Sequence, residues 1–159
     1  MIGTIASLGG LCISIWLIFI TQDARDAARE ARALARKRNL VEELESALQM
    51  IQQVGNFVQQ EQWFAVRLRA DEISSTCRIA LTRWPDHLSV ENKDNVVSAI
   101  GLVGSIAKAA SEHNNDNGIT LSRKRKINDA HVRASDHISS ALGEARRSEE
   151  RDGEEENAN

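Results

Sequence analysis

Apolar residues are distributed along the chain in two ways. Residues 1–20 form one continuous run, MIGTIASLGGLCISIWLIFI, with no charged side chain, whereas later apolar residues recur at helical spacing between charged ones. Twenty helical residues span about 30 Å, the thickness of the hydrocarbon core of a bilayer. The run therefore predicts a single transmembrane helix over residues 1–21.

A cleaved signal peptide and a buried helix of a soluble protein are the two alternatives to this anchor. A signal peptide has a basic start, a shorter apolar core and a small-residue cleavage site, and the chain lacks this pattern. Trp16 and Phe19 lie near the end of the run. They favour the anchor, because aromatic rings concentrate at the membrane interface.

Beyond residue 39, four stretches carry apolar residues alternately three and four positions apart. This spacing is typical of amphipathic helices that pack against one another. The stretches are 40–58, 63–84, 96–110 and 127–145. Short polar or proline-containing segments separate them. The sequence therefore predicts an all-α fold, in which the transmembrane helix continues into a cytoplasmic antiparallel four-helix bundle over residues 40–147.

Single residues mark expected helix ends and weak points. Pro85 predicts the end of the second bundle helix, and Ser89 is expected to cap the start of the third. Gly55 is expected to loosen the first bundle helix. Gly101 and Gly104 lie inside the third helix, where they are expected to permit close contact between helices at a cost in helix stability.

Residues 22–39 predict a basic helix next to the membrane. Arg25, Arg29, Arg32 and Arg36 step by four, three and four positions and so share one helix face. We expect this face to contact anionic lipid headgroups, worth about 1 kcal/mol per basic residue. The alternative is a solvated helix whose interleaved acids pair with the arginines. The positive charge places the N-terminus outside and residues 21–159 in the cytoplasm, in a single-pass plasma (inner) membrane protein.

Charge and cysteine content refine this organisation. The chain has a net charge of −3, but residues 148–159 hold six acids and one arginine, which leaves a net charge of +2 on the rest. We expect this acidic tail to be disordered, because no apolar residue recurs regularly in it. Cys12 and Cys77 lie in the anchor and in a distant helix, so they predict no disulfide and fit a reducing compartment.

Small residues at four-residue spacing recur in the anchor. Gly3 and Ser7 form one such pair, and Gly10 and Ser14 form another. This spacing lets membrane helices approach closely, so it predicts that the anchor self-associates into a homo-oligomer. The alternative is that glycine and serine are simply common in membrane helices.

No motif in the sequence predicts catalysis, a cofactor or a metal. The histidines are not spaced as paired helix ligands and are expected to lie at the surface; they are His87, His113, His131 and His137. Cys77 occupies an apolar seam position and is expected to be buried. The acids Glu42, Glu43 and Glu45 are expected to solvate an exposed face. We therefore expect a non-enzymatic protein.

The densest basic run is Arg123, Lys124, Arg125 and Lys126. It lies at a helix start, where positive charge is mildly unfavourable, so it indicates a contact with a partner. Nucleic acid is disfavoured as that partner, because no aromatic residue lies nearby to stack on bases. A solvated helix end is the alternative.

These patterns lead to two functional hypotheses. The first is a single-pass membrane protein, bound to membrane lipids, whose cytoplasmic bundle tethers or scaffolds a protein partner. The second is a membrane-active effector or regulator that oligomerises through its small-residue anchor. Growth arrest on overexpression that is abolished by Gly10→Leu would favour the second hypothesis.

Overall fold

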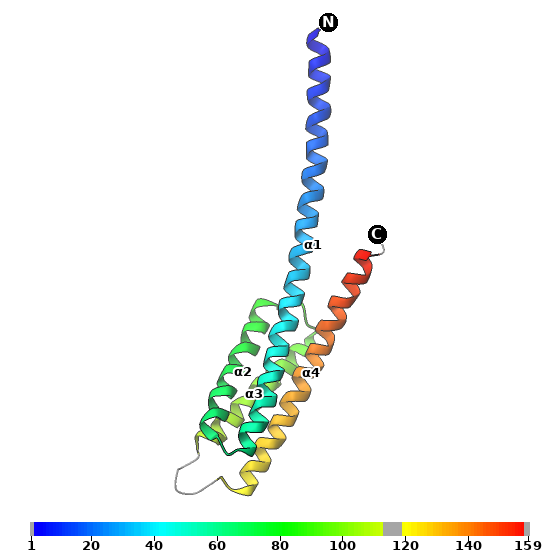
Figure 1. Cartoon of the computed structure of the whole chain (residues 1–159). Helices are drawn as coiled ribbons and strands as arrows, with labels where there is room; N and C mark the ends of the chain where they lie inside the picture. Colours follow the sequence, from blue (N-terminus) through cyan, green and yellow to red (C-terminus); the bar gives the residue numbers. More distant parts are fainter. Residues whose placement is uncertain (1, 113–118, 158–159) are drawn as a thin grey trace. The chain divides into compact units, whose positions relative to one another are not determined.

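The computed structural model describes the backbone of residues 2–112 and 119–157 (Figure 1). It describes the surroundings of side chains for a smaller set, residues 25, 28–29, 31–32, 35–112 and 119–151. Within this part of the chain there are four helices and no strand. They are α1 (Ile2–Gln59), α2 (Trp63–Arg83), α3 (Val90–Ser111) and α4 (Leu121–Asn157). The prediction of an all-α protein is confirmed.

The chain divides into two compact units, residues 1–36 and 37–159. The first unit consists of the N-terminal part of α1. The second unit combines the rest of α1 with α2, α3 and α4, and its core draws on all four helices. The prediction of a helical bundle is confirmed for this unit.

Contacts between helices show that neighbours run in opposite directions. Along α1, Glu43 contacts Arg83 at the end of α2, while Glu45 contacts Arg146 in the second half of α4. Further along α1, Ile51 contacts His131, which is earlier in α4. As residue numbers increase along α1, those of the contacted α4 residues decrease, so the two helices are antiparallel, as in an up-and-down bundle.

The core consists of the apolar seams that the sequence pattern predicted. On α2 the buried positions are Trp63, Val66, Ala70, Ile73, Cys77 and Ala80. Leu44, Ala47, Val66, Ala134 and Ile138 have no exposed surface. Many of these residues are alanine, whose small side chain permits close packing of helices. Asn92 is the one buried polar residue among the described side chains.

The predicted helix ends are also confirmed. α1 and α2 are separated at residues 60–62, and α2 ends at Arg83, two residues before Pro85. Ser89 caps α3, because its hydroxyl oxygen accepts a hydrogen bond from the backbone N–H of Asn92 at 3.3 Å.

The predicted close helix contact at Gly101 and Gly104 is wrong, and Gly55 does not interrupt α1. α1 continues without a break through Gly55, and a Cβ atom at this position would lie only 3.1 Å from Nε2 of His131. Gly55 therefore makes room for a side chain of α4 rather than loosening α1. Gly101 and Gly104 are exposed, and a Cβ atom on either would meet nothing within 4 Å. They do not mediate a helix contact within the described chain.

α4 also extends further than expected. It continues through Asn157, whereas the sequence predicted disorder from residue 148. Glutamate and arginine are good helix formers, and extending an existing helix is much easier than starting one. Helix propensity thus carries α4 beyond its last buried residue, Ala145.

None of the helices contains a stretch long and apolar enough to cross a bilayer within the residues that could be assessed. The side chains of residues 1–24 are not among them. The predicted anchor over residues 1–21 and the small-residue pairs Gly3–Ser7 and Gly10–Ser14 therefore lie outside the residues whose side-chain surroundings the structure describes.

Candidate functional site: the outer groove between α2 and α3

An open groove of about 630 Å³ runs along the outer surface between α2 and α3. α3 contributes a floor of small and apolar residues, namely Ile100, Gly104 and Ala107. α2 contributes a longer and more polar wall: Asp71, Ser74, Ser75, Arg78, Ile79, Thr82 and Arg83. The groove is bounded by side chains that can bind a helix or peptide through both apolar and charged contacts.

Four residues of the α2 wall belong to a stripe on the helix face opposite the core. Its members recur at the same alternating spacing as the buried seam, which keeps them on one side of the helix. They are Phe64, Leu68, Asp71, Ser75, Arg78 and Thr82. Phe64 is 80% exposed, Leu68 is 52% exposed, and Ile79 at the edge of this stripe is 40% exposed. We call these six residues the outer stripe of α2.

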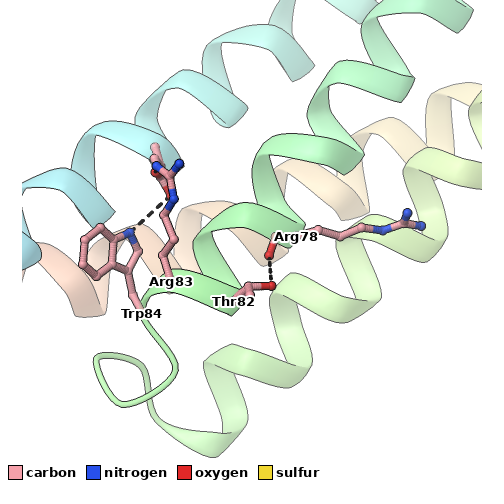
Figure 2. A network of polar contacts seen from close by, with 5 residues as sticks. Arg78, Thr82, Arg83 and Trp84 are labelled. Carbon is pink, nitrogen blue, oxygen red and sulfur yellow. Dashed lines mark hydrogen bonds and ion pairs between the residues drawn. The ribbon is translucent and has the colours of Figure 1, made fainter.

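Hydrogen bonds fix one end of the groove (Figure 2). Arg83 contacts Oε1 of Glu43 at 3.2 Å, and Nε1 of Trp84 donates to Oε2 of the same carboxylate at 3.3 Å. The hydroxyl of Thr82 donates to the carbonyl oxygen of Arg78 at 2.8 Å. Glu43 thus ties the end of α2 to α1, so its expected role as a solvating residue is wrong.

Arg83 forms an ion pair with Glu43, whereas Asp71 and Arg78 have no ion-pair partner among the described residues. Both are exposed on the outer stripe, and neither makes an ion pair with any residue that the structure describes. They are seven residues apart, which separates them by two turns or about 10.5 Å along the helix. They cannot pair with each other, so both charges remain available to a partner.

The predicted lipid-contact residues are exposed on α1. Arg25, Arg29, Arg32 and Arg36 all lie at the surface, in the segment that precedes the bundle unit. This exposure is compatible with both the headgroup contact and the solvated helix, so the prediction stays open.

The basic run of α4 is divided between two environments. Arg123 pairs with Glu112 at 3.3 Å, and Lys124 pairs with Glu61 in the turn between α1 and α2. Arg125 and Lys126 are exposed. Half of the run therefore joins helix ends within the bundle, and the predicted partner contact stays open for Arg125 and Lys126.

A polar network between α3 and α4 was missed by sequence reasoning. The Glu144 carboxylate accepts hydrogen bonds from the backbone N–H and the hydroxyl of Ser89, both at 2.8 Å, and from the amide of Asn92. Asn92 Oδ1 accepts from the amide of Asn95 at 2.9 Å, and Asn95 Oδ1 lies 2.9 Å from Nδ1 of His137. Asn92 stands one turn before Val96, so extending the α3 seam backwards would have found it.

This network lowers the pKa of Glu144. Partial burial alone would raise the pKa, but the hydrogen bonds from Ser89 and Asn92, together with the nearby positive charge of Arg147, outweigh it. A carboxylate whose folded pKa is depressed stabilises the fold above its unfolded pKa. That contribution is lost as pH falls from about 4.5 through the folded pKa.

We therefore expect Glu144→Gln to cost about 1 kcal/mol at pH 7, after allowing for solvent screening. The cost should shrink as pH falls through the depressed pKa of Glu144, because the wild-type carboxylate then becomes protonated as well. Urea unfolding at pH 7 and pH 3 measures both values. Glu91→Gln, which changes an exposed acid in the first turn of α3, is the control and should show no such convergence. An equal cost at both pH values would contradict the assignment.

His131 and Cys77 both lie inside the bundle. Nε2 of His131 lies 2.9 Å from the carbonyl oxygen of Ile51, and its Nδ1 is buried without a hydrogen-bond partner. The expectation of surface histidines is therefore wrong for His131 and also for His137, because both are half-buried and bonded across helices. The prediction that Cys77 is buried is confirmed, and burial raises the pKa of its thiol to about 12. The thiol stays protonated and unreactive at neutral pH.

Among the described residues, no three histidine, cysteine, aspartate or glutamate side chains are grouped so that they could hold a metal ion. Comparison of the chain with known protein families, with curated proteins and with solved structures finds no match.

Proposed function

We propose that this chain is a non-enzymatic, single-pass membrane protein whose helical bundle holds a protein partner at the cytoplasmic face of the membrane. The observation that carries the proposal is the composition of α1. This one helix begins in a run of 20 uncharged residues and ends as a wall of the bundle core. A helix with both properties links a membrane anchor directly to a folded domain.

The charge pattern after the run supports an N-out, C-in orientation. Six basic residues lie between residues 21 and 39, and they are Arg25, Arg29, Arg32, Arg36, Lys37 and Arg38. Positive residues next to a membrane helix remain on the cytoplasmic side. The bundle then faces the cytoplasm, and the four arginines of the stripe lie where anionic headgroups are within reach.

The groove between α2 and α3 supplies the partner-binding surface in this proposal. It combines the exposed apolar side chain of Ile79 with two charges that have no ion-pair partner in the described chain, Asp71 and Arg78. The outer stripe continues beyond the groove to the exposed side chains of Phe64 and Leu68. Aromatic and aliphatic side chains surrounded by polar groups are the usual centre of a protein interface. Confinement to a surface raises the local concentration of bound partners without any chemistry.

The tether is tested by transfer to a reporter. Residues 1–39 fused to a soluble fluorescent protein should carry the reporter into the membrane fraction. The matched fusion of residues 40–159 should leave the reporter in the supernatant. A soluble 1–39 fusion would refute the proposal, because the anchor would then fail outside its own chain.

A further inference from the structure

We propose that the partner of the α2 outer stripe is a second copy of this chain. The two α2 helices would lie antiparallel across a twofold axis between Ser74 and Ser75. This inference rests on the proposed function, since it names the occupant of the groove described there. It is independent of self-association through the anchor.

The charges on the stripe are self-complementary about this axis. Asp71 and Arg78 lie equally far from the midpoint between Ser74 and Ser75. In an antiparallel pair Asp71 meets the partner's Arg78, and Arg78 meets the partner's Asp71. A twofold interface contains every contact twice, so dimerisation gives both Asp71 and Arg78 an ion-pair partner. Arg67, another exposed charge near the stripe, falls opposite the partner's Thr82, and the adjacent Arg83 of the partner is already paired with Glu43 of its own chain.

The side chains near the axis also suit close packing. Ser74 and Ser75 are small, and the neighbouring floor of the groove contains Gly104 and Ala107. Gly104 has open space above it, since a Cβ atom there would meet nothing within 4 Å. Small residues at a crossing point let two helices approach closely.

Apolar residues flank the axis at distances that match in an antiparallel pair. Leu68 lies about two turns from the axis and falls opposite the partner's Ile79 and Thr82. Phe64 lies one turn further and falls opposite the partner's Trp84 and Pro85. Phe64 and Leu68 are 80% and 52% exposed. Burial of such side chains supplies most of the favourable free energy of an interface.

The mixed sign of the charges favours a second copy over a partner helix whose charges all have one sign. A helix with acidic side chains would satisfy Arg78 but would oppose Asp71, and a basic helix would do the reverse. An unpaired charge at an interface is costly to desolvate. The antiparallel copy places the required opposite charge at both positions.

The test is a charge-reversal cycle on the full chain in mild detergent, with dimerisation measured by analytical ultracentrifugation. Asp71→Arg alone and Arg78→Asp alone each create two like-charged contacts, so each should weaken dimerisation at least about tenfold. The double variant Asp71→Arg/Arg78→Asp restores both pairs in reverse and should recover an affinity within about threefold of wild type. Both positions are exposed, so circular dichroism should show folded variants.

A second measurement tests the position of the twofold axis by cross-linking. In a Cys12→Ala background, Ser75→Cys should form a cross-linked dimer with a short bifunctional thiol reagent. Ser139→Cys, an exposed serine on α4, is the matched control and should not. Cross-linking at both sites or at neither, a chain that stays monomeric, or a dimer unaffected by charge reversal would each overturn the inference. So would a monomer whose groove is filled by a different protein.

The two proposals fail in different ways. If the reporter fusion of residues 1–39 is held at the membrane but charge reversal has no effect, the tether stands and only the dimer is wrong. If the fusion is soluble while the charge-reversal cycle behaves as expected, the dimer stands and the tether is wrong.

Discussion

Ile73→Ala is expected to lower the free energy of unfolding by about 2–5 kcal/mol, which is a large part of the total for a domain of this size. Ile73 is 1% exposed and lies in the middle of the α2 seam. Its neighbours in the core come from all four helices and include Ile51, Val103 and Ala134. Removing three carbon atoms there leaves a cavity that no single helix can fill by shifting. Urea denaturation followed by circular dichroism measures the change.

Ile79→Ala is the matched control for this prediction. It makes the same substitution on the same helix, but Ile79 is 40% exposed. We expect a change within about 0.5 kcal/mol, because little buried surface is lost and alanine favours the helix. Equal costs at positions 73 and 79 would contradict the assignment of the inner and outer faces of α2.

The double variant Leu11→Lys/Ile15→Lys is expected to release the protein from the membrane fraction. Both residues belong to the uncharged run, near its middle. A lysine at the centre of a membrane helix costs about 2.5–3.5 kcal/mol of insertion free energy, so two cost roughly 5–7 kcal/mol. This corresponds to a shift of about four orders of magnitude in the insertion equilibrium. Fractionation of cells followed by immunoblotting measures the shift.

Leu11→Ala/Ile15→Ala controls for the loss of the original side chains. This variant keeps the run uncharged and should stay in the membrane fraction. If the lysine variant also stays there, the run does not act as a membrane anchor. If both variants are lost from the cell, pulse labelling distinguishes degradation from failure to insert.

The sequence was sufficient for the parts of the fold that depend on local chemistry. The alternating spacing from Trp63 to Ala80 predicted which residues of α2 are buried, because a regular helix places such positions on one face. Pro85 and Ser89 predicted helix ends, since both act on the backbone within a few residues. These effects require no knowledge of neighbouring helices.

Contacts between helices could not be predicted in the same way. Gly55 looked like a weak point because its use depends on His131, which lies 76 residues later and packs against it. Glu43 looked like a solvating residue because its partners, Arg83 and Trp84, lie at the end of another helix. Glu144 was unremarkable until α3 and α4 were placed side by side. Each of these roles depends on which helices are neighbours, and a periodic pattern does not encode that.

The groove between α2 and α3 could be predicted in part from the sequence. The spacing of Phe64, Leu68 and Asp71 is visible in the sequence and could have predicted a second stripe on α2. The sequence does not show whether another helix covers this stripe. Only the packed bundle shows that the stripe faces outward and that Asp71 and Arg78 make no ion pair with the described residues.

The most direct test of the central proposal is protease protection on membranes, with a different tag at each end of the chain. We predict that the protein stays in the pellet after alkaline carbonate extraction. Protease added to the cytoplasmic face should remove the C-terminal tag, and protease added to the outer face should not. A protein released by carbonate, or one whose C-terminal tag is cut only from outside, would contradict the account of an N-terminal anchor that holds a cytoplasmic bundle at the membrane.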